Sequence, residues 1–102
     1  MNIITRNTLL VYAEKYPLAK VALFNWYHEF LKADYQNFNE LKSFYGSASL
    51  VANNRLIFNV KGNNYRLIIS INFKQQAAYI IWFGTHSEYD KIDAATVAFK
   101  ST

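Results

Sequence analysis

The spacing of apolar residues changes once along the chain, and this change indicates the class of fold. Between residues 5 and 34 the apolar residues recur every three or four positions, which is the spacing of a helix with one buried face. From Leu50 onward, β-branched and aromatic residues form short runs that are separated by turn residues. The sequence therefore predicts an N-terminal helical part followed by a sheet, which together make an α+β domain.

The only proline, Pro17, divides the helical part into two predicted helices. The first covers residues 5–16, with Thr5 or Asn7 available as its cap, and the second covers residues 18–34, with Pro17 suited to its first turn. Because the connection is short, we expect the helices to pack as an antiparallel pair. Residues 37–46 break the helical pattern.

Strands are predicted at residues 55–60, 65–73 and 77–83, with a short helical turn at 87–93 and a possible edge strand at 1–4. Alternate side chains of the 65–73 strand point to opposite faces of the sheet. One face is apolar (Leu67, Ile69, Ile71) and the other is mixed (Arg66, Ile68, Ser70, Asn72). We expect two layers, with both helices on the apolar face of a small, mainly antiparallel sheet and the mixed face open for a ligand.

Positive charge is concentrated in the middle of the sequence. The chain has 11 Lys and Arg against 7 Asp and Glu, which gives a net charge of +4. Residues 41–87 contain no acidic residue, but they contain five basic ones: Lys42, Arg55, Lys61, Arg66 and Lys74. If this segment forms one surface, that surface is positive and suits an anionic partner; the alternative is a set of scattered, solubilising side chains.

Several classes of protein are disfavoured by what the sequence lacks. It has no cysteine, which argues against disulfides and thiolate chemistry and is natural for a reducing cytoplasm. It has no glycine-rich phosphate loop and no paired-histidine metal signature, so we expect no cofactor and no catalytic metal. The start lacks a secretory signal, and the longest run without Asp, Glu, Lys or Arg, residues 75–87, is too short to cross a membrane. We expect a soluble cytoplasmic protein.

Two residues stand out as candidates for chemistry. His86 ends a predicted strand and precedes Tyr89 and Asp90, at a place where a sheet edge would hold a catalytic side chain rigidly; a structural or helix-capping histidine is the alternative. Arg66 follows a turn and either pairs with Asp90 or stabilises a phosphate. The other histidine, His28, lies within a predicted helix and is expected at the surface.

Two blocks of the sequence, residues 59–68 (NVKGNNYRLI) and 84–91 (GTHSEYDK), resemble the signature blocks of the HigB family of messenger-RNA interferases, within the RelE-like toxin superfamily. The segment Ala13-Glu14-Lys15-Tyr16-Pro17, the pair Leu41-Lys42 and the aromatic helix that carries Trp26 also match. The patterns F-N-x-x-x-N-x-Y-R and T-H-x-E-Y-D are specific when they occur together. The resemblance covers roughly residues 3–93.

This resemblance implies that residues 1–102 form a single RelE-like toxin domain of a type II toxin–antitoxin pair. It implies a ribosome-dependent endoribonuclease that inhibits translation and works without metal. The 2′-hydroxyl of the RNA attacks the neighbouring phosphodiester and leaves a cyclic phosphate and a 5′-hydroxyl. The implied partners are messenger RNA on the ribosome and a HigA-type antitoxin with a helix-turn-helix, whose complex with the toxin would bind operator DNA.

Such a reaction needs a group that removes the hydroxyl proton, a group that protonates the leaving oxygen, and a fixed cation near the phosphate. His86 suits either proton role because an imidazole can accept or donate a proton, Tyr89 is an acid or a positioning hydrogen bond, and Arg66 suits the electrostatic role. Asp90 is expected to orient a cation or a histidine. The remaining candidates would contact RNA: Lys42, Lys61 and Lys91 through backbone phosphates, and Asn59 and Asn63 through hydrogen bonds or by shaping the turn.

Two other functions remain open from the residues alone. One is a non-catalytic RNA- or ribosome-binding module that uses the same positive face without chemistry. The other is a protein-interaction domain that docks a partner through its aromatic surface. Binding without cleavage would favour the first of these, and binding that does not respond to salt would favour the second, because phosphate contacts release counterions.

Overall fold

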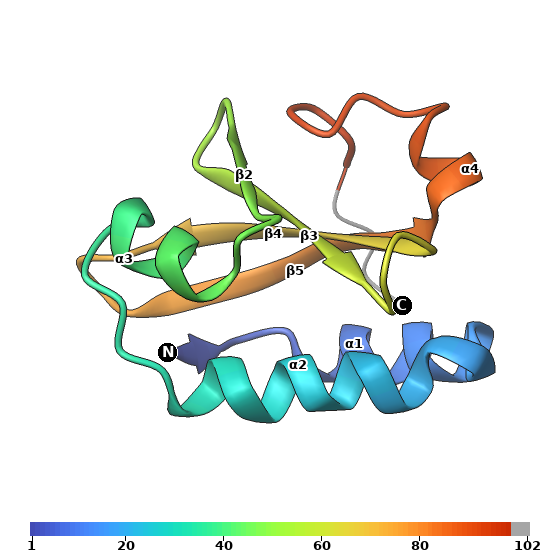
Figure 1. Ribbon diagram of the computed structural model, residues 1–102, viewed down its shortest axis with the longest axis horizontal. Helices are drawn as coiled ribbons and strands as arrows, with labels where there is room; N and C mark the ends of the chain where they lie inside the picture. Colours follow the sequence, from blue (N-terminus) through green and yellow to red (C-terminus); the bar gives the residue numbers. More distant parts are fainter. Residues whose placement is uncertain (99–102) are drawn as a thin grey trace.

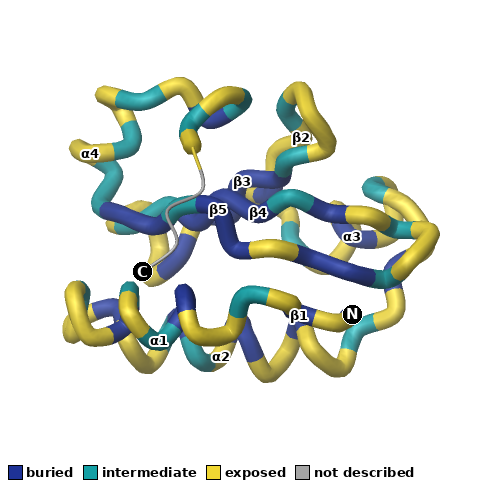
Figure 2. Tube along the Cα trace, turned by 180° about the vertical axis from the view of Figure 1, so that it is seen from behind, coloured by how far each residue is buried: buried dark blue, intermediate teal, exposed yellow. Residues whose placement is uncertain are grey.

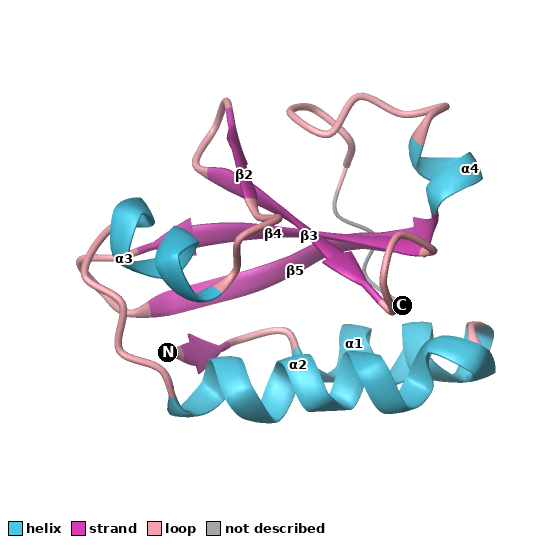
Figure 3. Ribbon diagram, in the orientation of Figure 1, coloured by secondary structure: helices cyan, strands magenta, loops and turns pink. Residues whose placement is uncertain are grey.

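The computed structural model of the chain describes residues 1–98 and contains one five-stranded sheet (Figures 1 and 3). The strand order is β1-β5-β4-β3-β2, and the strands are β1 (Asn2–Ile3), β2 (Ser49–Val51), β3 (Arg55–Val60), β4 (Tyr65–Asn72) and β5 (Ala77–Thr85). Neighbours from β2 to β5 pair antiparallel, whereas β1 pairs parallel with β5. The predicted α+β class, the mainly antiparallel sheet and the N-terminal edge strand are all confirmed.

Helices α1 (Arg6–Lys15) and α2 (Lys20–Lys32) lie as an antiparallel pair against one face of the sheet (Figure 1). A 3₁₀ turn, Pro17–Ala19, joins them, and the fixed φ of Pro17 suits its first position. The hydroxyl of Thr5 does not cap α1; it accepts a hydrogen bond from the backbone N–H of Ile80 at 2.6 Å and ties the helix start to β5. Within residues 1–98, no helix is both long and apolar enough to cross a membrane.

A third helix, α3 (Phe38–Phe44), lies within residues 37–46. The sequence predicted no helix in this segment, and that prediction was wrong. The helix begins at Asn37, whose side chain accepts a hydrogen bond from the backbone N–H of Glu40 at 3.0 Å. Only Leu41 of this helix is buried. With one buried residue there is no repeating apolar face, and for this reason the spacing of apolar residues did not reveal the helix.

The main core lies between the sheet and α1 and α2. Leu67, Ile69 and Ile71 of β4 belong to it together with Leu23 and Phe30 of α2, which confirms the predicted parity of this strand. Aromatic rings fill much of the space: Phe30 stacks on Trp26 with ring centres 4.9 Å apart and meets Phe58 edge-on at 5.8 Å. Dark blue segments on both layers mark this core in Figure 2.

The opposite face of the sheet carries a second, smaller apolar cluster that includes Ile57, Ile68, Ile81 and Ala94. The chain after β5 returns across this face, so Ile68 is fully buried, and the expectation of an open face was wrong over its middle. A β-bulge adds a further apolar residue to this face. Ile68 pairs with Trp82 but Ile69 pairs with Ile80, so Ile81 is the extra residue of the bulge and joins the same cluster. This apolar patch needs a cover.

The cover is held by a cation as well as by packing. Arg55 of β3 donates from Nη1 to the carbonyl oxygens of Ala94 at 3.0 Å and Val97 at 2.7 Å. Asn53 donates from Nδ2 to the carbonyl oxygen of Ala95 at 2.8 Å. These bonds satisfy backbone groups of an irregular segment that covers the middle of this face, and the end of the face near Arg66 is less covered.

Candidate active site

Two turns of the chain meet at one end of the sheet and build the candidate active site. The turn 61–64 joins β3 to β4, and the short helix α4 (His86–Tyr89) follows β5 directly. Because Tyr65 pairs with Thr85 in the β4–β5 ladder, the turn and the start of α4 are adjacent. The backbone N–H of His86 donates to the carbonyl oxygen of Asn64 at 2.9 Å. The predicted helical turn therefore exists and begins at His86.

Arg66 lies on β4 between two neighbouring strands, opposite Asn59 of β3 and Gly84 of β5. Its Nη2 donates to Oδ1 of Asn63 at 2.6 Å, and its Nη1 donates to the carbonyl oxygens of Asn63 at 3.2 Å and Tyr65 at 3.1 Å. These bonds hold the guanidinium in one orientation, as expected of a cation that must stay fixed during a reaction.

Tyr89 of α4 approaches the same guanidinium. Its ring centre is 5.8 Å from Cζ of Arg66, which is within the range of a cation–π contact. The ring is also tilted against that of Trp82, with the centres 6.3 Å apart. Tyr89 is half-buried and packs beside the smaller apolar cluster, so the sheet below it is one of the contacts that hold its ring.

His86 and Asp90 form a pair one helical turn apart. Nδ1 of His86 lies 3.2 Å from Oδ2 of Asp90, and the two side chains are 41 % and 61 % exposed. A carboxylate on Nδ1 orients the ring and leaves Nε2 for a ligand. Of the two roles considered for Asp90, the structure shows the pairing with histidine, while Arg66 bonds to Asn63.

A capping box fixes the start of α4. The hydroxyl of Thr85 accepts from the backbone N–H of Glu88 at 3.1 Å, and Oε1 of Glu88 accepts from the backbone N–H of Thr85 at 2.9 Å. The same carboxylate accepts a hydrogen bond from the hydroxyl of Tyr16 at 2.8 Å. The bond from Thr85, followed by that from Tyr16, lowers the pKa of Glu88 below its ordinary value, and burial raises the pKa of Tyr16.

The structure gathers most of the predicted site residues but not all of them. Six of the predicted residues lie at the α4 end of the sheet: Arg66, Tyr89, His86, Asp90, Asn63 and Asn59. The exposed Lys61 is in the adjoining turn. Lys91 follows α4 and lines a pocket of about 440 Å³ between α1 and α4, together with Lys15, Tyr16 and Glu88. His28 is exposed on α2, as predicted.

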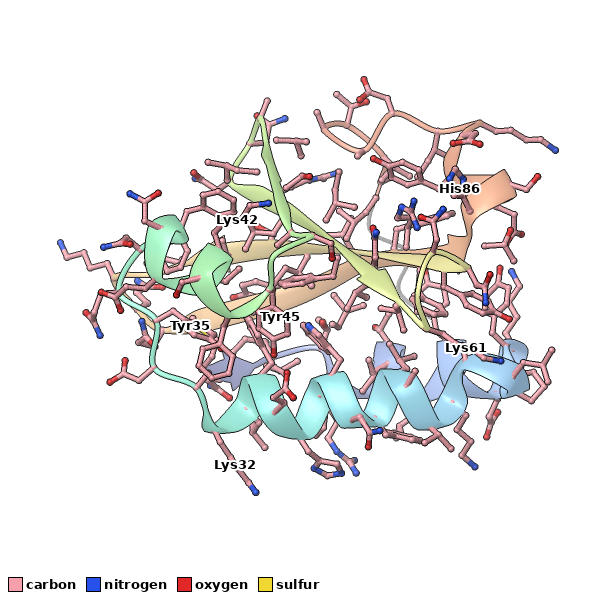
Figure 4. All side chains as sticks on the ribbon, viewed as in Figure 1. Lys32, Tyr35, Lys42, Tyr45, Lys61 and His86 are labelled. Carbon is pink, nitrogen blue, oxygen red and sulfur yellow. The ribbon has the colours of Figure 1, made fainter. Side chains whose placement is uncertain are left out.

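Lys42 lies apart from these residues. Figure 4 shows it on α3, at the opposite end of the sheet from His86. Its ammonium group donates to the carbonyl oxygens of Gly46 at 2.6 Å and Ala48 at 2.7 Å, at the end of α3. The five basic residues of the middle segment also do not form one surface, because Arg55 binds the C-terminal cover and Lys74 follows the far end of β4.

Trp82 and Gly84 support the site and were not singled out from the sequence. A Cβ atom on Gly84 would lie 2.6 Å from Cη2 of Trp82 and 3.1 Å from Oε1 of Glu88, so the indole ring rests directly on this glycine. A glycine inside a predicted strand often marks such a close approach, and that signal was present in the sequence. The T-x-x-E spacing of Thr85 and Glu88 is likewise a readable capping signal.

The arrangement is suited to chemistry on a phosphate ester. A fixed guanidinium, an imidazole held by a carboxylate and a phenol lie at one partly exposed end of a sheet. Together they offer one permanent cation and two groups able to exchange protons. Within residues 1–98, no three His, Asp or Glu side chains gather in a way that could hold a metal ion.

The chain is similar to known proteins over most of its length. The chain is 33% identical over 92 residues to the mRNA interferase toxin HigB of Escherichia coli (strain K12), which covers 88% of each chain. It is 29% identical over 94 residues to the mRNA interferase HigB of Escherichia coli O6:H1, which covers 90% of this chain and 91% of that relative. Residues 19–92 match the family described as the RelE-like toxic component of a toxin–antitoxin system. The chain therefore belongs to the HigB toxin family, and its kind of partner is an antitoxin.

Proposed function

We propose that this chain is the toxin of a type II toxin–antitoxin pair and that it inhibits translation by cutting messenger RNA on the ribosome. The observation that carries the proposal is the cluster of Arg66, Tyr89 and His86 at the α4 end of the sheet. Its residue types match the demands of RNA cleavage, and relatives that cover most of the chain are named mRNA interferases. A non-catalytic RNA-binding module would not need an imidazole oriented by a carboxylate at the same end of the sheet as a fixed guanidinium.

In the proposed reaction the 2′-hydroxyl oxygen bonds to the adjacent phosphorus, and the bond from phosphorus to the 5′-oxygen breaks. The products are a cyclic phosphate and a 5′-hydroxyl. Arg66 offsets the charge that grows on the phosphate oxygens. His86 exchanges a proton through Nε2 while Asp90 holds Nδ1, and Tyr89 either exchanges the second proton or donates a hydrogen bond to the phosphate.

The ribosome would supply what a small, open site lacks. His86 and Asp90 are well exposed, so the protein alone does not enclose its substrate. Alignment of a nucleophile with its target contributes roughly 7–11 kcal/mol to catalysis, and a ribosome could hold the message in the required geometry. Lys61 and Lys91 would contact backbone phosphates, and Asn59 and Asn63 would contact RNA or shape the site. The reaction would use no metal and no cofactor.

The partner that neutralises the toxin would be a HigA-type antitoxin with a helix-turn-helix, and the complex of the two would bind operator DNA. Expression of the intact chain alone in cytoplasm should arrest growth. Co-expression of a small helix-turn-helix protein encoded beside it should relieve the arrest. Harmless accumulation of folded protein at high level would contradict the toxin role.

The decisive experiment is a translation reaction with a reporter message, followed by primer extension to map new 5′ ends. We expect cuts in translated message and little cutting of naked RNA. Association with ribosomes without new ends would instead identify a non-catalytic module. Metal analysis of the purified protein and treatment with transition-metal chelators test the metal-free mechanism, which stoichiometric zinc or loss of activity on chelation would contradict.

A further inference from the structure

Two motifs that the sequence resemblance rests on meet in the structure through residues other than Arg66, His86 and Tyr89. Tyr16 comes from the A-E-K-Y-P segment at the end of α1, and Glu88 comes from the T-H-x-E-Y-D block. The hydroxyl of Tyr16 donates to Oε1 of Glu88 at 2.8 Å, across a separation of 72 residues. This is a direct side-chain bond between the helical layer and α4.

The acceptor atom is the one that organises α4. Oε1 of Glu88 accepts from Tyr16 at 2.8 Å, from the backbone N–H of Thr85 at 2.9 Å and from the hydroxyl of Thr85 at 3.1 Å. α4 has four residues and buries none of them fully. A helix this short has little stability of its own, so its orientation depends on its cap and on its outside contacts.

Tyr16 is well placed to set that orientation because its own ring is fixed. The ring meets Tyr65 and Phe83 edge-on, with centres 5.8 and 5.6 Å apart. Both partners belong to central strands, so the hydroxyl has a fixed place relative to the sheet. Burial raises the pKa of Tyr16, so the hydroxyl keeps its proton and stays a donor over the physiological range.

We propose that Tyr16 is a positioning residue of the cleavage reaction: through Glu88 it sets the orientation of α4, and thereby places His86 and Tyr89 relative to Arg66. The proposal rests on the proposed function, because it assigns the contact a role in that reaction. Neither Tyr16 nor Glu88 is assigned a direct part in the chemical step. A misplacement of about 1 Å costs up to roughly 100-fold in rate, so the loss of one distant hydrogen bond should be measurable in the chemical step.

The first test is Tyr16→Phe, with Tyr12→Phe as the matched control. Tyr12 lies one turn earlier on α1 and also packs on Phe83, with ring centres 6.0 Å apart. We expect Tyr16→Phe to lower the single-turnover rate on programmed ribosomes by about 10- to 100-fold while half-saturation stays within about twofold. Tyr12→Phe should stay near the wild-type rate, and both variants should keep a melting temperature close to that of the wild type.

A conservative variant separates the hydrogen bonds from mere packing. In Glu88→Gln the amide oxygen can take the place of Oε1 and accept from Tyr16 and Thr85, whereas Glu88→Ala removes the acceptor. We expect Glu88→Gln to retain most of the rate and Glu88→Ala to lose at least as much as Tyr16→Phe. Wild-type cleavage by Glu88→Ala would overturn the proposal.

Hydrogen exchange gives a measurement that does not need cleavage. The amides of Thr85, Glu88 and Asp90 report on α4 and its cap, and they should exchange faster in Tyr16→Phe but not in Tyr12→Phe. If the wild type does not cleave message, the proposed function fails, while these amides still decide whether Tyr16 orders α4. An unchanged cleavage rate in Tyr16→Phe would overturn the positioning role, whether or not these amides exchange faster.

Discussion

The two faces of the sheet are covered in different ways. On the face toward α1 and α2, large side chains such as Leu23 and Phe30 are fully buried. On the other face, the cover is an irregular segment that contributes small side chains such as Ala94 and backbone carbonyls bound by Arg55. This cover leaves one end of its face to the candidate site. Most of the apolar burial that stabilises the fold is therefore on one face of the sheet, and the proposed chemistry is on the other.

If the faces are separated in this way, substitutions in the site should remove cleavage without unfolding the chain. We predict that His86→Ala and Arg66→Ala each lower the cleavage rate by about 10²–10⁴-fold, because a proton-transfer group or the fixed cation is lost. Each should change the free energy of unfolding by less than about 1 kcal/mol, since little apolar surface is exposed. Primer extension measures the cleavage rate, and urea unfolding measures the free energy of unfolding.

Wild-type cleavage by the His86 variant, with translation confirmed, would remove that residue from the mechanism. A large fall in melting temperature of either variant would support the structural alternative for that residue. Because the two measurements are independent, they distinguish a catalytic from a capping histidine.

A pair of core substitutions tests the difference in folding energy directly. Phe30→Ala on the helix-covered face should lower the free energy of unfolding by about 3–5 kcal/mol, because it opens a cavity among Trp26, Phe58 and their neighbours. Val97→Ala on the other face should cost about 1 kcal/mol, because Val97 is half-buried in a thin cover. Urea unfolding of the two variants checks the ratio, and equal losses would break the comparison.

A third substitution tests the junction between the cover and the site. Gly84→Ala should cost about 1–3 kcal/mol in stability and should also lower cleavage, because the new Cβ displaces Trp82 toward Tyr89 or moves Glu88. Gly46→Ala is the matched control, since a Cβ there meets nothing within 4 Å. Urea unfolding and single-turnover cleavage of both variants are the measurements; equal behaviour of the two would mean that the close approach is unimportant.

The helix-covered face was predictable from the sequence, and the other face was predictable only in part. Long apolar repeats revealed both main helices and three of the strands, because each buries a continuous face. α3 was missed because it buries only Leu41, and β2 because three residues, none of them fully buried, carry no pattern. The cover at 91–97 was missed because its few apolar residues, such as Ala94 and Val97, look like an ordinary tail.

The candidate site shows the same limit. The strand pattern placed Arg66 and His86 at ends of neighbouring strands, and pairing in the ladder brings those ends together. The expectation for Lys42 depended on where α3 lies, and the spacing of residues does not encode that position. The bond between Tyr16 and Glu88 joins residues 72 positions apart, so only the tertiary structure reveals it.

The smallest expected effect concerns the pH dependence of stability, and it tests whether the charge of Glu88 helps to hold α4 at the end of the sheet. The folded-state pKa of Glu88 is lowered from its ordinary value of 4.5 by the backbone N–H of Thr85 and then by Tyr16. A carboxylate with a lowered folded pKa stabilises the fold above its unfolded pKa, and this stability is lost as the pH falls through the folded pKa. Wild type should therefore be more stable than Glu88→Gln at pH 7, and the difference should shrink as the pH falls below about 4.5. The effect should be small because the carboxylate is largely exposed to water.

Tyr16→Phe removes one of the two hydrogen bonds that contribute most to the lowered pKa of Glu88. The pH dependence of its stability should therefore lie between that of the wild type and that of Glu88→Gln. Urea midpoints from pH 7 to pH 3 measure all three proteins, and a difference between wild type and Glu88→Gln that stays constant over this range would show that the hydrogen-bond geometry of Glu88, and not its charge, holds α4 in place.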